Sequence, residues 1–131
     1  MRIGHIEAQA GEHAFGYLKV ARSRSGLDLD IPLHLFVGIE PGPTLLVQGT
    51  VHGTEPLGAF AALNVVQRLN PRELRGTLIV VPVLNRVGFE LFQRLSPIDR
   101  QDINRLYPGD PQGSLSAQIA YVYFHGVIRR A

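Results

Sequence analysis

Two side chains near the middle of the sequence have the types and the spacing of metal ligands. His52 and Glu55 form an H-x-x-E pair directly after a short apolar run, Thr44–Gln48. An imidazole nitrogen together with a carboxylate oxygen suits a zinc ion. Because short motifs often occur by chance, a second interpretation stays open, in which Glu55 caps a helix and His52 is a hydrogen-bonded neighbour.

A second group of chemically capable residues follows later in the chain. Asn104 offers an amide, and Arg105 offers a rigid guanidinium; together they could hold a substrate carboxylate. Arg94, upstream of them, could stabilise an oxyanion that develops on a carbonyl under attack. The alternative is ordinary loop chemistry, in which aspartates cap turns and arginines form exposed ion pairs.

The elements around His52 and Glu55 are predicted to form a βαβ unit. Thr44–Gln48 and Thr77–Pro82 are apolar runs typical of buried strands, and Leu57–Leu69 between them is predicted to be a buried helix. Short links favour parallel pairing with a right-handed crossover. Open α/β sheets bind ligands where strands end and helices start, so we expect His52 and Glu55 to line a crevice.

The loop between this strand and this helix carries its own signals. Gly49 and Gly53 allow a sharp path for the backbone. Thr54 is expected to cap the helix, and Pro56 suits its first turn. Glu55 would then lie at the positive end of the helix dipole, which favours its ionised form.

The sequence before this unit predicts strands. Residues 2–8 and 15–22 are typical of short strands around a turn, and residues 29–37 alternate as in a half-buried strand. Pro32 favours an edge position for that strand. The run Pro41–Pro43, with a glycine at its centre, predicts a turn.

The sequence after the unit is less regular. Residues 85–113 are rich in Pro, Gly and Asp, with one or two helical turns expected near 88–93. Ser114 or Ser116 is expected to cap a last helix that runs to about Arg130. An alternating pattern would place a strand next, so we expect these residues to be the N-terminal portion of a longer, truncated catalytic domain.

Composition restricts the class of protein. With 131 residues, 45% hydrophobic and 18% charged, the chain is predicted to form a single globular domain. It has no cysteine, which excludes disulfides and thiolate metal sites. The net charge of +2 and the lack of a basic stripe argue against nucleic acid as a partner. No apolar run is long enough for a membrane and no signal peptide is evident, so we expect a cytoplasmic protein.

Taken together, the two groups of residues resemble the succinylglutamate desuccinylase/aspartoacylase family, whose members are related to zinc carboxypeptidases. The run Pro41–Glu55 resembles the glycine-rich strand end and H-G-x-E of that family. The run Asp102–Gly109 resembles its second block, usually D-L-N-R-x-F-P-G, with Val81–Asn85 and Arg94 in the same order between them. The resemblance covers the whole chain and implies an α/β fold with a mixed, largely parallel sheet flanked by helices.

The resemblance also implies an activity and a role for each residue. The family hydrolyses the amide bond of N-acyl amino acids or similar small molecules, with one Zn²⁺ per site. By resemblance, His52 and Glu55 are zinc ligands and Arg94 polarises the scissile carbonyl. Asn104 and Arg105 bind the carboxylate of the substrate.

The sequence departs from the family pattern at several points. Thr54 replaces the usual Asn or Asp, and Arg100 competes with Arg94 because the gap to Asn104 is longer than usual. The third zinc ligand, a histidine in an Asp-x-His motif, and the catalytic glutamate are not among these residues. His125 and His34 are expected to be ordinary surface side chains, so the resemblance implies an incomplete site that is inactive alone.

Two other functions stay open. The chain could be a non-catalytic structural or interaction fragment, whose exposed sheet edge promotes self-association. It could also belong to a peptidase of the zinc carboxypeptidase type, which uses the same pair of ligands.

Overall fold

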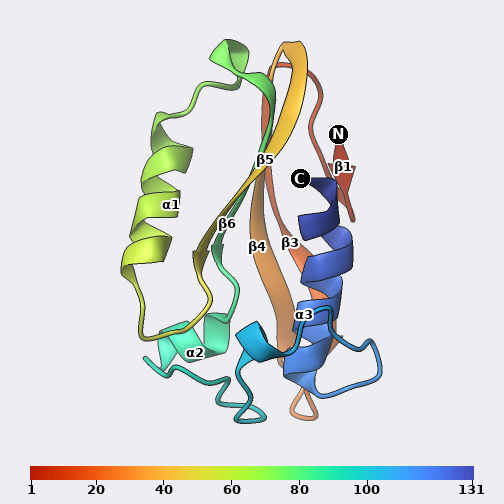
Figure 1. Cartoon of the computed structure of the whole chain (residues 1–131), viewed down its shortest axis with the longest axis vertical. Helices are drawn as coiled ribbons and strands as arrows, with labels where there is room; N and C mark the ends of the chain where they lie inside the picture. The colour runs from red at the N-terminus through yellow and green to blue at the C-terminus, as the bar shows by residue number, and fades with distance from the viewer.

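The chain folds into three layers, in which two helices cover opposite faces of one sheet (Figure 1). This computed structural model describes all residues, 1–131. The α/β class with a mixed sheet, predicted from the sequence, is confirmed. In chain order the elements are β1 (Arg2–Ile3), β2 (Ile6–Glu7), β3 (Glu12–Arg22), β4 (Asp28–Val37), β5 (Glu40–Thr50), α1 (Leu57–Arg68), η1 (Pro71–Glu73), β6 (Arg75–Val83), α2 (Arg86–Glu90), η2 (Ile103–Arg105), α3 (Leu115–Gly126) and η3 (Ile128–Arg130).

The main sheet has the strand order β3-β4-β6-β5. Strands β5 and β6 are parallel and are joined through α1, as the βαβ prediction requires. The pairs β3–β4 and β4–β6 are antiparallel, so the expectation of a largely parallel sheet is wrong for these residues. The β3–β4 and β4–β5 connections are too short for a parallel crossover, so β4 runs opposite to β3 and to β5. Because β6 is parallel to β5, it too runs opposite to β4.

Strand β6 lies between β4 and β5, although β4 and β5 follow each other closely in the sequence. The backbones approach closely where β6 begins: a Cβ on Gly76 would lie 2.2 Å from the carbonyl oxygen of Pro43. Gly76 also has a φ of +87°, which side chains rarely allow. The turn predicted at Pro41–Pro43 is absent; these residues form the irregular start of β5, with a register shift between Glu40 and Thr44.

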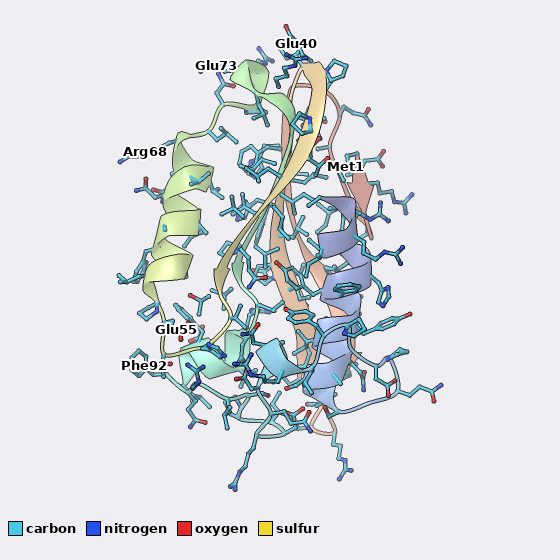
Figure 2. All side chains as sticks on the ribbon, in the orientation of Figure 1. Met1, Glu40, Glu55, Arg68, Glu73 and Phe92 are labelled. Atoms are coloured by element: carbon cyan, nitrogen blue, oxygen red, sulfur yellow. The ribbon has the colours of Figure 1, made fainter.

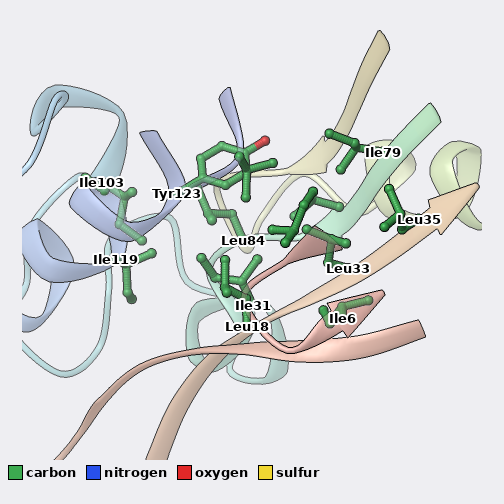
Figure 3. Packing of buried hydrophobic residues seen from close by; sticks show 14 of the residues in the cluster. Ile6, Leu18, Ile31, Leu33, Leu35, Ile79, Leu84, Ile103, Ile119 and Tyr123 are labelled. Atoms are coloured by element: carbon green, nitrogen blue, oxygen red, sulfur yellow. The ribbon is translucent and has the colours of Figure 1, made fainter. Parts of the chain in front are cut away.

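Alternation along β6 builds the core on both faces of the sheet. Ile79 and Val81 pack in the larger cluster beneath α3, and Leu78 and Val80 pack in the smaller cluster beneath α1. Figure 3 shows Tyr123 of α3 in the larger cluster, together with Ile79 and other strand residues. The predicted buried strand is confirmed, because helices cover both of its faces.

Helix α1 has the predicted bounds to within one residue, but it is not buried on most sides. Only Ala59 and Ala62 are buried, whereas Leu57 is 80% exposed and Phe60 is 62% exposed. Strand β5 forms the edge of the sheet, and Leu45 on it is also exposed. Apolar composition predicted burial here, but only one side of each element has a neighbour.

Two other local predictions have mixed outcomes. The edge position predicted from Pro32 is wrong, because β4 is an inner strand. Proline is tolerated there because β6 pairs only with His34–Val37, so Pro32 has β3 alone beside it. Ser114 caps α3 by accepting a hydrogen bond from the backbone N–H of Ala117.

No helix combines the length and the apolar character that a membrane crossing requires.

Candidate functional site

The loop at the end of β5 brings His52 and Glu55 to one end of the sheet. Thr50 organises this loop, because its hydroxyl donates to the carbonyl oxygen of Glu55 and accepts from the N–H of Ala59. Thr54 does not cap the helix as predicted; the N-cap is Pro56, and no side-chain cap bond is present. Thr50 takes over the capping role from within the strand, since its hydroxyl satisfies one N–H of the first turn.

Gly53 allows the loop to pack against the start of the next helical segment. A Cβ at this position would lie 2.0 Å from the carbonyl oxygen of Gly88, in α2. The predicted need for glycine here is therefore a close approach of two backbone segments. Figure 2 shows Glu55 at the same end of the molecule as Phe92 and at the opposite end from Glu40.

His52 lies between two carboxylates. Its Nδ1 is 3.2 Å from Oε1 of Glu55, and its Nε2 is 2.9 Å from Oδ1 of Asp102. The imidazole is buried, with 6% of the residue exposed, whereas the carboxylate of Glu55 is accessible. Each ring nitrogen therefore has its own acidic neighbour, and the ring orientation is determined from both sides.

Asp102 is a candidate site residue that was not predicted from the sequence as a metal ligand or a substrate-binding residue. Besides contacting His52, it caps η2 by accepting the N–H of Asn104. Burial alone would raise the pKa of Asp102, but the hydrogen bonds from His52 and from the N–H of Asn104 outweigh burial and lower that pKa. A buried histidine needs a partner for its second nitrogen, and that requirement is the signal that could have identified Asp102.

Arg94 is the arginine that reaches this site. Its Nη1 donates to Oε1 of Glu55 at 3.1 Å. Arg100, the competing candidate, has a positive φ of 58°, lies exposed and makes no side-chain contact with His52 or Glu55. The geometry therefore favours Arg94 over Arg100 for a role beside Glu55.

Asn104 and Arg105 lie on η2 immediately after Asp102, and both side chains are exposed. Ile103 between them and Asp102 is buried and anchors this short helix in the core. Because Asp102 contacts His52, η2 is placed on the same side of the molecule as the His52–Glu55 pair. The two predicted blocks thus meet in space, although they lie far apart in the sequence.

The other histidines lie elsewhere. His125 is exposed on α3 beside Tyr121 and Phe124, and His34 lies on β4 next to His13. The structure contains no group of three or more histidine or acidic side chains that could hold a metal ion.

Comparison with known proteins shows which family the chain belongs to. Residues 41–126 match the sequence model of the Succinylglutamate desuccinylase/Aspartoacylase catalytic domain. The chain belongs to the succinylglutamate desuccinylase/aspartoacylase family. The matched range contains both blocks that meet at His52. The family membership predicted from the sequence is confirmed.

Relatives in this family include a curated enzyme and several solved structures. The chain is 33% identical over 115 residues to the N-alpha-acetyl-L-2,4-diaminobutyric acid deacetylase of Halomonas elongata, covering 88% of this chain. A succinylglutamate desuccinylase/aspartoacylase from Rhodobacter sphaeroides superposes with a TM-score of 0.82 at 34% identity, over 94% of this chain. The product-bound ectoine utilization protein EutE (DoeB) of Ruegeria pomeroyi superposes with a TM-score of 0.80 at 30% identity, over the whole chain.

These family members are considerably longer than the chain. The 131 residues span 34% of the Halomonas elongata enzyme, 38% of the Rhodobacter sphaeroides structure and 42% of the Ruegeria pomeroyi structure. The family assignment therefore concerns the part of the catalytic domain that carries the H-x-x-E and D-I-N-R blocks.

Proposed function

We propose that this chain forms part of a zinc-dependent deacylase that hydrolyses the amide bond of an N-acyl amino acid. The observation that carries the proposal is the arrangement of His52 between Glu55 and Asp102. Membership of a family that includes an N-acetyl amino acid deacetylase supports the same reaction class.

The arrangement calls for a positive charge between His52 and Glu55. When Nε2–H of His52 donates to Asp102, the lone pair of Nδ1 faces a carboxylate oxygen, and two acceptors repel each other. A second proton or a metal ion between them removes the repulsion. Metal-bound histidines commonly donate their other N–H to a carboxylate, and Asp102 is placed to accept it.

The residues present fit a zinc ion as two of its ligands. Tetrahedral ligands at bond lengths of about 2.0–2.2 Å lie about 3.3 Å apart. The separation of 3.2 Å between Nδ1 of His52 and Oε1 of Glu55 agrees with that value. Catalytic zinc takes three protein ligands and a water molecule, so we expect a third ligand from residues that this sequence does not contain.

The candidate site residues of this chain each have a defined role in the proposed reaction. Zinc, when bound, polarises the scissile carbonyl and lowers the pKa of a water molecule to about 7. Arg94 donates hydrogen bonds to the oxygen on which negative charge develops. Asn104 and Arg105 bind the carboxylate of the substrate in a fork-like geometry and orient the amide. The general base comes, like the third ligand, from outside these residues.

A zinc titration with a competing chromophoric chelator tests the proposed metal pair. We expect the chain alone to bind Zn²⁺ weakly, with a Kd of about 10 μM or weaker, because only two ligands are present. His52→Gln should abolish this binding, whereas His125→Gln, which removes an exposed histidine, should leave it unchanged. One tight equivalent of zinc per chain, or unchanged binding in His52→Gln, would refute the proposed site.

A chimera tests the proposed reaction. Residues 1–131 replace the aligned segment of the Halomonas elongata deacetylase, and circular dichroism checks that the chimera folds. We expect zinc-dependent hydrolysis of an N-acetyl amino acid, lowered at least about 100-fold by Arg94→Ala. Arg100→Ala is the matched control and should retain activity. A folded chimera without hydrolysis, or equal losses in the two arginine variants, would contradict the assigned roles.

We also propose that the chain by itself self-associates through the edge of β5. This edge has no strand beside it, carries no charged residue between Glu40 and His52, and exposes Leu45. Unprotected strand edges pair with other chains. Sedimentation velocity should show concentration-dependent dimers that Leu45→Lys reduces and Leu27→Lys, on the β3–β4 hairpin, does not. A monomer at all concentrations would contradict this proposal.

A further inference from the structure

A cavity of about 430 Å³ lies next to the β3–β4 hairpin, α2 and α3, and it shares no residue with the candidate site. Its volume falls within the range of about 300–1,000 Å³ that is typical of small-molecule sites. The proposed deacylase reaction assigns it no role. The chemistry of its lining residues therefore indicates which ligand it could bind.

The deep wall of the cavity is apolar. Leu29, Leu84 and Ile119 line it and are at most 8% exposed, whereas Leu27 and Leu91 at its rim are about half exposed. Such a gradient from apolar depth to open rim suits a ligand with a hydrocarbon part. A short aliphatic chain would cover this wall and release the water that contacts it.

One charged side chain at the rim, Glu90, has no ion-pair partner. Arg86, on the cavity lining, is paired with Asp30 and also lies over the ring of Tyr17, so its positive charge is already engaged. Asp28 is paired with Arg22. Glu90 lines the cavity, lies exposed and forms no ion pair or hydrogen bond through its carboxylate. The free charge at the opening is therefore negative, although the chain as a whole is positive.

A buried polar side chain also lines the cavity. Asn85 lines the cavity with 3% of the residue exposed, and its Oδ1 accepts the N–H of Gly88. This bond occupies the amide oxygen, so the amide nitrogen of Asn85 is the group that can donate to a ligand. A ligand acceptor, such as a hydroxyl or an amide carbonyl, would satisfy it.

We propose that this cavity binds a short amphiphilic cation: a primary alkylammonium group near Glu90, methylene groups against the leucine wall, and a neutral hydrogen-bond acceptor toward Asn85. The free carboxylate of Glu90 disfavours an anionic ligand and attracts a cation. The site is distinct from the proposed zinc pair, so its test does not depend on metal binding or on hydrolysis.

A titration followed by ¹H–¹⁵N correlation spectra tests the proposal with matched probes of equal chain length. The probes are 5-aminopentan-1-ol, pentylammonium, pentan-1-ol and pentanoate, at pH 7. We expect shifts confined to amides near residues 27–30, 84–91, 96–98 and 119, which line the cavity. The ammonium compounds should bind about fivefold more tightly than pentan-1-ol, with the amino alcohol tightest and pentanoate weakest.

Two charge-neutralising variants distinguish the rim carboxylate from general electrostatic attraction. Glu90→Gln should reduce the preference for ammonium over alcohol to less than about twofold. Glu40→Gln, an exposed carboxylate at the opposite end of the molecule (Figure 2), should retain the preference. Val87→Phe, which adds volume to the cavity lining, should weaken all four probes. Equal binding of ammonium and alcohol, shifts at other residues, or an unchanged preference in Glu90→Gln would overturn the proposal.

Discussion

Asp102 illustrates how one residue can serve local structure and the site together. It caps the short helix η2 and also accepts the Nε2–H side of a buried imidazole that lies fifty positions away in the sequence. The cap determines where η2, which carries Asn104 and Arg105, begins. The contact with the imidazole determines the orientation of the His52 ring. One hydrogen bond thus joins two blocks that lie far apart in the sequence.

Replacement of Asp102 should therefore cost more than the loss of a turn cap. We expect Asp102→Ala to lower the free energy of unfolding by about 2–3 kcal/mol, since a buried imidazole loses a charged partner. Asp110→Ala removes a similar turn bond, to the N–H of Gln112, without an imidazole contact, and should cost about 1 kcal/mol or less. Urea denaturation measures both; equal losses would contradict the role given to the His52 contact.

Tyr123 offers the opposite case, a buried polar atom whose removal should help. Its hydroxyl and that of Tyr107 are buried without a hydrogen-bond partner, and burial raises the pKa of Tyr107 to about 12. We expect Tyr123→Phe to raise the free energy of unfolding by about 1 kcal/mol, because an unpaired buried hydroxyl is costly. Tyr121→Phe, on the same helix but only half-buried, should change it by less than about 0.5 kcal/mol. A loss of stability in Tyr123→Phe would show instead that the hydroxyl has a bound partner.

At the scale of elements, the insertion of β6 between β4 and β5 determines where the site lies. Pairing with β5 places the end of β6 beside the end of β5, and the N–H of Leu84 donates to the carbonyl oxygen of Thr50. The loop that carries His52 and the segment that leads to α2 therefore start at the same edge. This arrangement requires the close passage of backbones at Gly76.

Two glycine substitutions separate close packing from backbone conformation. Gly76→Ala should lower the free energy of unfolding by more than about 3 kcal/mol, because its Cβ would overlap the carbonyl oxygen of Pro43. Gly26 has a similar φ of +84° but no atom within 4 Å of an added Cβ, so Gly26→Ala should cost only about 1 kcal/mol. Thermal and urea denaturation measure both variants. Equal costs would mean that φ alone, and not the strand insertion, makes Gly76 necessary.

At the scale of the whole molecule, the charges favour stability near neutral pH. Burial and the neighbouring His13 lower the pKa of His34 to about 4. Burial alone would raise the pKa of Asp99, but the hydrogen bonds that this carboxyl accepts, chiefly from Ser116, outweigh burial and lower that pKa. The hydrogen bond from Arg22 lowers the pKa of Asp28. In every case the unfolded chain binds protons at a higher pH than the folded one, so acid favours unfolding.

His34 should cause a separate fall in the free energy of unfolding within this pH dependence. Between pH 6.5 and about 4 the unfolded chain protonates His34 while the folded chain does not, so stability falls as the pH falls through that window. We expect a loss of about 1–2 kcal/mol there, after screening by solvent. His34→Gln should flatten the curve between pH 6.5 and 4 and leave the further decline below pH 4, which the carboxylates cause. Urea denaturation across this pH range measures both; an unchanged curve in His34→Gln would contradict the assignment.

The sequence by itself determined the local elements and the pair at the centre of the site. The apolar run of β6, the bounds of α1 and a serine cap at Ser114 or Ser116 are short-range patterns, because neighbours in the chain suffice to produce them. The spacing of His52 and Glu55 likewise brings their side chains together within one loop. These features could be predicted because each depends on residues that are close in sequence.

Only the tertiary structure decided the strand order, the exposure of α1 and β5, the contact of Asp102 with His52, and the cavity beside α2. Each depends on which surfaces meet, and that choice is made by backbone approach and packing between distant segments. An apolar residue such as Leu57 or Leu45 has the same local pattern whether a neighbour covers it or not. Long-range contacts therefore determined what the periodicity of the sequence left undecided.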